Sequence, residues 1–134
     1  LFEKTYNMML SEARTAMDDF KIHRALEAIW RVVADANAYI DEQAPWTLKK
    51  EDPARMNTVL YVLADVIRCL AIAVQAVVPD SAAKMLDQLK VPENERAYEH
   101  ISADYALKSG TAIDKPEGVF PRIVEESEPE RAAG

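Results

Sequence analysis

The feature that most constrains the fold is a stretch of apolar residues at helical spacing over residues 53–78. Large apolar side chains recur there at steps of three and four, which places them on one face of an α-helix. This predicted core stripe consists of Met56, Leu60, Leu63, Ile67, Leu70, Val74 and Val78. The narrow polar strip that remains consists of Asn57, Asp65, Arg68 and Gln75. A helix that is apolar nearly all round is expected at the centre of a bundle.

Proline and aspartate mark the ends of this helix and of the one before it. Asp52 is a good N-cap and Pro53 suits the first helical position, while Pro79 is expected to end the helix. Pro45 ends the preceding helix, because the residue before a proline avoids the helical conformation. The sequence therefore predicts a short link over residues 44–51 between two long helices.

Apolar periodicity also predicts helices over residues 1–18 and 20–43, and a short helix capped by Asp80 or Ser81. The core stripe of the second helix is predicted to be Ile22, Leu26, Ile29, Val33, Ala36 and Ile40. A flank beside that stripe carries His23, Trp30, Asn37 and Asp41. The predicted fold class is all-α.

The domain organisation follows from these patterns and from the length of 134 residues, which suits one domain. Residues 1–108 are predicted to form a bundle of four to five helices. Residues 109–124 are expected to be an extended C-terminal peptide, because Pro116 and Pro121 exclude a helix. Residues 125–134 form an acidic tail that is expected to be mobile.

Few side chains in the sequence are suited to catalysis. His23 and His100 have no convincing metal-ligand partners, and Cys69 on an apolar helix is expected to be a structural thiol. The 3 glycines are too far apart for a phosphate-binding loop. We therefore predict no catalytic residue, no metal site and no bound cofactor in this segment.

Charge and hydropathy limit the partners. The net charge of −7 argues against broad binding to a nucleic-acid backbone, so DNA is not an expected partner. Residues 1–55 carry 8 basic and 10 acidic side chains, whereas residues 56–134 carry 8 and 13. The longest apolar run, residues 69–78, is much shorter than the ~20 residues of a bilayer span, so no membrane is expected.

Trp46, directly after Pro45, has two interpretations. It could be a lid that closes the end of the bundle. It could instead be an aromatic platform for a splayed base of an RNA loop, where stacking contributes about 1–3 kcal/mol. Asn37, two to three helical turns earlier, could read a base edge or could bridge neighbouring helices. Lys49 and Lys50 follow Trp46 and allow a local phosphate contact.

Residues 36–46, Ala-Asn-Ala-Tyr-Ile-Asp-Glu-Gln-Ala-Pro-Trp, resemble the hallmark of the anticodon-binding domain of methionyl-tRNA synthetases. The other matching segments are residues 23–30, 59–70, 79–89, 115–117 and 120–123. The resemblance extends from residue 1 to about residue 124. Other class I synthetases have related helical domains, and the Phe-Pro-Arg-Ile peptide at residues 120–123 narrows the resemblance to the methionyl enzyme.

The resemblance implies that the chain is the C-terminal part of a cytoplasmic methionine–tRNA ligase. Such an enzyme charges tRNA(Met) with methionine through methionyl adenylate, using ATP and magnesium, on a Rossmann-type domain whose motifs are absent here. The implied partners are the anticodon loop of tRNA(Met) and the catalytic domain of the same enzyme.

The resemblance also assigns roles to individual residues. Trp46 would stack on an anticodon base, Pro45 would shape the loop, and Asn37 would lie in the recognition region. Asp41 would repel wrong anticodons by its charge. Arg122, in a peptide that folds back on the catalytic half, would contact tRNA or the other domain.

Two departures from the family pattern affect these expectations. The family also reads the anticodon with an Asn and an Arg on a helix that precedes this chain's first helix, so RNA binding by the segment alone should be weakened. Gly118-Val119 stands where the family usually has Pro-Leu. Two alternatives remain open: the corresponding domain of another class I synthetase, and a helical protein-interaction module without an RNA role.

Overall fold

The computed structural model describes residues 1–124, which are helical with irregular connections and contain no strand. The acidic tail expected over residues 125–134 lies outside the described residues. The longer elements are η1 (Lys4–Met9), α1 (Leu10–Asp18), α2 (Ile22–Gln43), α3 (Pro45–Glu51), α4 (Pro53–Ala73) and α5 (Pro79–Gln88). Three single turns of 3₁₀-helix follow: η2 (Glu93–Glu95), η3 (Tyr98–His100) and η4 (Ala103–Tyr105). The predicted all-α fold is confirmed.

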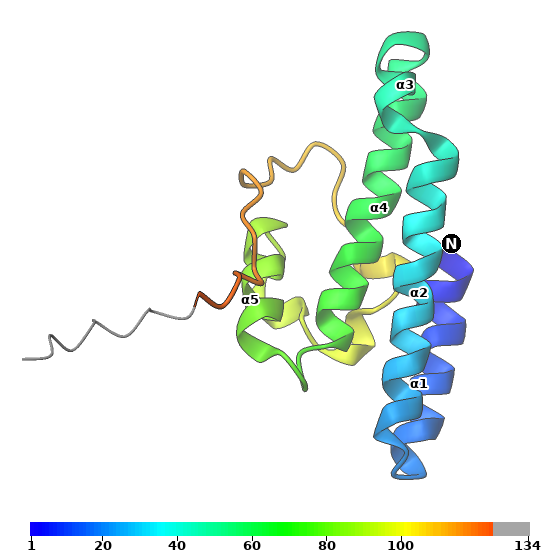
Figure 1. Ribbon diagram of the computed structural model, residues 1–134, viewed down its shortest axis with the longest axis vertical. Helices are drawn as coiled ribbons and strands as arrows, with labels where there is room; N and C mark the ends of the chain where they lie inside the picture. Colours follow the sequence, from blue (N-terminus) through cyan, green and yellow to red (C-terminus); the bar gives the residue numbers. More distant parts are fainter. Residues whose placement is uncertain (125–134) are drawn as a thin grey trace, which may run out of the picture.

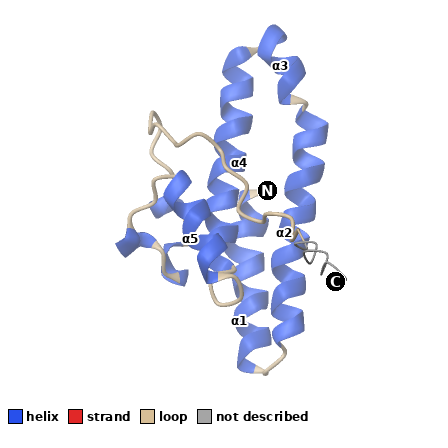
Figure 2. Cartoon of the chain, turned by 60° about the vertical axis from the view of Figure 1, so that its left-hand side comes forward, coloured by secondary structure: helices blue, strands red, loops and turns tan. Residues whose placement is uncertain are grey.

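Helices α2 and α4 run side by side as an antiparallel pair that determines the length of the molecule (Figure 1). The continuous helix η1–α1 packs against α2 and also contacts α4, and α5 packs against α4. At one end the α2–α4 pair extends beyond α1 and α5, and α3 lies across that tip (Figures 1 and 2). The turn between α1 and α2 lies at the opposite end (Figure 1).

The predicted core stripes of α2 and α4 are only partly buried. Leu60 and Ile67 of α4 are 45% and 43% exposed, whereas Val59 and Val66 are fully buried. In α2, Ile22 is 58% exposed. The face of α2 that packs against α1 is instead rich in alanine, and small side chains at a helix contact let two helices approach closely. The stripe prediction placed the largest apolar side chains in the core, and this was wrong for several of them.

Two members of the polar strip predicted on α4 are buried, whereas Asn57 is exposed. Asp65 is fully buried and Arg68 is 1% exposed. The Arg68 Nε donates to Asp65 Oδ1 at 2.7 Å. Its Nη1 donates to the carbonyl of His100 at 2.7 Å, and its Nη2 to the carbonyl of Ser102 at 3.2 Å. Arg68 thus provides hydrogen-bond donors to carbonyls of a segment without a continuous helix.

Asp65 ties two further parts of the chain to α4. The backbone N–H of Leu107 donates to Asp65 Oδ1 at 2.9 Å, and the hydroxyl of Tyr6 donates to Oδ2. Burial and the hydrogen bond to Asp65 raise the pKa of Tyr6 above its usual range, so the hydroxyl stays protonated. The Asp65–Arg68 pair therefore joins the first helix, α4 and the C-terminal segment.

Several helix boundaries differ from the prediction. The link expected over residues 44–51 contains the short helix α3, and α4 ends at Ala73 rather than near Pro79. Helix α5 begins at Pro79 without a side-chain cap, so the predicted caps Asp80 and Ser81 are wrong. The Asp52 cap is confirmed, because its Oδ1 accepts a hydrogen bond from the backbone N–H of Arg55 at 3.0 Å.

Among residues 1–124, α4 is the one helix that is long and apolar enough to cross a membrane by length and composition. Core helices of globular domains have the same properties, and α4 contacts η1, α2, α3 and α5. This composition is consistent with the position of α4 in the middle of the fold.

The C-terminal peptide is fastened to α5. The Gln88 side chain accepts from the Glu117 N–H at 2.9 Å and donates to the Glu117 carbonyl at 3.1 Å. The Ser81 hydroxyl donates to the carbonyl of Val119 at 3.2 Å. The extended C-terminal peptide that forms part of the predicted fold class is thus present, and side chains of α5 hold it.

Candidate functional site

The chain turns sharply from α2 into α3 at the tip of the molecule. Ala44 ends α2 in the left-handed conformation, with φ 44° and ψ 63°, and Pro45 is the first residue of α3. The proline disfavours a helical Ala44, and its fixed φ suits the first position of the next helix. Pro45 is buried, so its ring anchors the start of α3.

Trp46 lies immediately beyond this anchor and is directed outward. Its side chain is 61% exposed, so it does not close the end of the bundle. Lys49 and Lys50 follow at positions i+3 and i+4, which places them on the same face of α3 as Trp46. Neither lysine forms an ion pair with another residue in the range 1–124. The tip thus presents an aromatic face beside two free ammonium groups.

Asn37 and Asp41 are exposed on α2, below the tip. Their spacing of four residues places both on one face of the helix. Within the part of the chain that the structure describes, neither side chain is engaged in a hydrogen bond or an ion pair, so Asn37 does not bridge neighbouring helices. Both polar groups are therefore free to meet a ligand that approaches the tip.

The helix ends beneath α3 are fixed to each other. The Arg55 Nη2 at the start of α4 donates to Gln43 Oε1 at the end of α2, at 2.7 Å. The Asp52 cap holds the first turn of α4 in the same region. These two contacts join the end of α2 to the start of α4 beneath Trp46.

Arg122 lies in a different part of the structure. It is exposed and follows the segment that Ser81 and Gln88 hold against α5, not the tip that α3 forms. The structure therefore groups Trp46, Pro45, Asn37 and Asp41 on one arm and separates Arg122 from them.

The remaining candidate groups for catalysis have structural surroundings. Cys69 is fully buried, and burial raises the pKa of its thiol to about 12, so the thiol remains protonated at neutral pH. His100 is buried and its Nδ1 accepts a hydrogen bond from the backbone N–H of Ala97 at 2.9 Å. Residues 1–124 contain no group of three or more His, Cys, Asp and Glu side chains that could hold a metal ion.

Comparison with known proteins identifies the family. Residues 2–133 match the family described as the anticodon binding domain of methionyl tRNA ligase. The chain belongs to this family. The chain is 54% identical over 117 residues to the methionine–tRNA ligase of Mesorhizobium japonicum, a match that covers 87% of the chain. It is 51% identical over 119 residues to the methionine–tRNA ligase of Brucella suis, with 89% of the chain covered.

Solved structures of family members show the same fold. The apo form of the Mycobacterium tuberculosis methionyl-tRNA synthetase matches with a TM-score of 0.84 and 40% identity, over 93% of this chain and 26% of that protein. A second structure of that enzyme, bound by methionyl-adenylate, matches with a TM-score of 0.83 and 40% identity, over 90% of this chain and 24% of that protein. The chain spans only 23% of the length of the two ligases named above.

Proposed function

We propose that this chain recognises the anticodon of tRNA(Met) as part of a methionine–tRNA ligase. The observation that carries the proposal is the exposed indole of Trp46, which the buried Pro45 and the left-handed Ala44 hold at the tip of the α2–α4 arm. An exposed aromatic side chain is suited to stacking on a base of a single-stranded loop.

The neighbouring side chains would make this stacking selective. The Asn37 amide can donate to and accept from a base edge. Asp41, four residues further along the same face, places a negative charge that would repel the acceptor groups or the phosphate of an incorrect nucleotide. Anticodon reading at this site would therefore combine an aromatic platform, an amide and a repelling carboxylate.

The chemical step would belong to the rest of the enzyme. We infer that the full-length ligase acts in the cytoplasm and forms methionyl adenylate from methionine and ATP with magnesium. The adenylate-bound structure of the Mycobacterium tuberculosis relative supports the adenylate step of this inference. Arg122 and the C-terminal peptide would contact the tRNA or the catalytic domain, because the guanidinium is exposed beyond the segment fastened to α5.

Binding of tRNA(Met) to the full-length ligase tests the proposal. Replacing Trp46 with alanine removes a stacking contribution of about 1–3 kcal/mol and is expected to weaken tRNA binding about 5- to 150-fold. The matched control is Phe20→Ala, because Phe20 is 92% exposed but lies in the turn at the opposite end of the molecule. Unchanged binding by Trp46→Ala would favour the alternative of an interaction module without an RNA role.

The role of Asp41 has a separate test. Asp41→Asn keeps the shape of the side chain and removes its charge. Binding of tRNAs with altered anticodons should rise relative to binding of tRNA(Met), because the repulsion is lost while the stacking on Trp46 remains. An equal change for all tRNAs would assign Asp41 a general electrostatic effect instead of discrimination.

A further inference from the structure

A side-chain hydrogen bond joins the two long helices directly beneath α3. The Arg55 Nη2 donates to Gln43 Oε1 at 2.7 Å. We propose that Gln43 and Arg55 are positioning residues, which set the orientation of Trp46 toward the anticodon without touching the RNA themselves. This inference rests on the proposed function, because it takes Trp46 to be the group that stacks on an anticodon base.

Within residues 1–124, the Gln43–Arg55 bond is the one side-chain hydrogen bond or ion pair that connects α2 to α4. The ion pairs that α2 makes with other helices run from Asp35 to η1 and from Arg31 to α1. The Asp65 carboxylate of α4 binds η1 and the segment that follows α5. Loss of the Gln43–Arg55 bond would therefore remove the polar link between α2 and α4.

This bond lies in the half of the helix pair that the core does not reach. The buried residues of α2 end at Val32, and residues 33–44 include none that is buried. In α4 the first buried residue is Val59. The next residue, Leu60, is 45% exposed and lines a hollow of about 460 Å³ together with Ile40 of α2. Core packing therefore constrains the spacing of α2 and α4 less near the tip.

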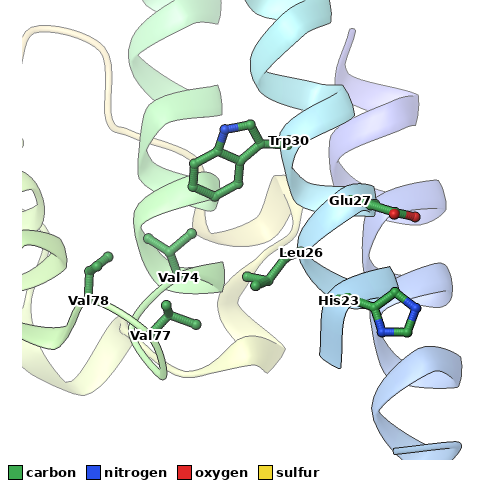
Figure 3. Close-up of a pocket in the computed structure, with 7 residues that line it drawn as sticks. All are labelled: His23, Leu26, Glu27, Trp30, Val74, Val77 and Val78. Atoms are coloured by element: carbon green, nitrogen blue, oxygen red, sulfur yellow. The ribbon is translucent and has the colours of Figure 1, made fainter. Parts of the chain in front are cut away.

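The half of the pair that lies away from the tip is packed through apolar side chains. Ile29 and Val32 of α2 belong to the same buried cluster as Val66 of α4. Leu26 packs against this cluster, and Figure 3 shows it directed toward the chain that follows α4, where Val74 is buried. The helix pair is thus joined by apolar packing at one end and by the Gln43–Arg55 bond at the other.

The orientation of Trp46 depends on the two helix ends that this bond joins. Helix α3 has 7 residues, which is too short for a helix to be stable by itself, and it lies across the ends of α2 and α4 (Figure 2). Gln43 is the last residue of α2 and Arg55 lies in the first turn of α4, so the bond closes the loop of residues 44–54 at its base. A change in the spacing of the helix ends would therefore turn α3 and, with it, the indole.

A direct contact of Arg55 with a phosphate is the alternative. The Arg55 guanidinium is engaged by Gln43, and the Arg55 backbone N–H is bound by the Asp52 carboxylate. Lys49 and Lys50, by contrast, form no ion pair with any residue of the described part of the chain. The two lysines are therefore the cations available to a phosphate near Trp46, and Arg55 serves as the link between the helices.

A double-mutant cycle on the binding of tRNA(Met) to the full-length ligase tests the inference. Gln43→Met and Arg55→Met each remove the bond and keep an unbranched side chain. Each should weaken binding about three- to tenfold, and the two together should weaken it no more than either alone. In the Trp46→Ala background neither should weaken binding further, because both act through the indole. Arg31→Met is the matched control, since Arg31 is an exposed arginine of α2 that pairs with Glu12 about 18 Å from Gln43 along the helix axis, and binding should stay unchanged.

Every other outcome overturns the inference. A loss confined to one of the two variants would assign a direct RNA contact to that residue, and for Arg55 the salt dependence of binding would then fall by about one counterion. Losses that add in the double variant, or that persist without the indole, would separate the bond from Trp46. If Trp46→Ala weakens tRNA binding while both single variants leave it unchanged, only the positioning inference fails. Unchanged binding by Trp46→Ala itself would instead contradict the proposed function.

Discussion

Replacing Arg68 with methionine should destabilise the fold strongly, because Arg68 and Asp65 are both almost completely buried. Breaking a buried ion pair from one side costs about 3–5 kcal/mol, since the remaining charge is left uncompensated. The carbonyls of His100 and Ser102 also lose their donor, at about 1 kcal/mol each. The Tyr6 hydroxyl and the Leu107 N–H still donate to Asp65 and offset part of this cost. We expect a net loss of about 4 kcal/mol.

The double variant Asp65→Leu/Arg68→Met should be more stable than Arg68→Met alone. It removes the lone charge and leaves four neutral groups without partners at about 1 kcal/mol each. The burial of the two new apolar side chains offsets about half of this, so the total cost is about 2 kcal/mol. Urea unfolding followed by circular dichroism measures both variants. Lys90→Met is the control, because the Lys90–Asp114 pair at 2.6 Å is about half exposed and its loss should cost less than about 1 kcal/mol. A cost below about 1 kcal/mol for Arg68→Met, or a double variant no more stable than the single one, would refute this reasoning.

Urea unfolding also tests the parts that Ala44, Asp52 and Cys69 play in the stability of the fold. Ala44→Gly should be neutral or stabilise the fold by up to about 1 kcal/mol, because glycine tolerates the φ of 44° at this position. Ala44→Val should destabilise the fold by more than about 1 kcal/mol. A valine variant more stable than the glycine variant would show that the turn is not strained. Asp52→Ala removes the cap on the Arg55 N–H and should cost about 1 kcal/mol, and no loss would mean that water replaces the cap. Burial raises the pKa of Cys69 to about 12, so the folded state keeps a proton that the unfolded state loses above about pH 9. Stability should therefore fall by about 1.4 kcal/mol per pH unit from pH 9 to 12, and Cys69→Ala should reduce that slope; an unchanged slope would exclude the thiol as its cause.

Local patterns of the sequence predicted much of the fold. Helical periodicity gave the all-α class, and Asp52 and Pro53 predicted the start of α4 correctly, because caps and prolines act within a few residues. The same local rules missed α3, since the proline that ends α2 also begins a new helix after Ala44. The left-handed Ala44 that separates them has no sequence signal, because glycine or asparagine usually occupies that conformation.

Contacts between distant segments were not predictable from periodicity. The sequence marks Asp65 and Arg68 only as part of a polar strip on a helix, and their burial depends on contacts with residues 100–107. The stripes of α2 and α4 look like core, yet their members Ile22, Leu60 and Ile67 are exposed. The roles of Trp46, Asn37 and Asp41 stay a prediction that rests on one short segment, which the resemblance marks as a unit.

The most direct test of the central claim compares two activities of the full-length ligase that carries Trp46→Ala. The account places Trp46 at the anticodon and away from the chemical step. It therefore predicts that aminoacylation of tRNA(Met), measured as kcat/KM, falls about 5- to 150-fold, while the rate of methionyl adenylate formation without tRNA stays unchanged. An equal fall in both activities, or no change in aminoacylation, would contradict the account.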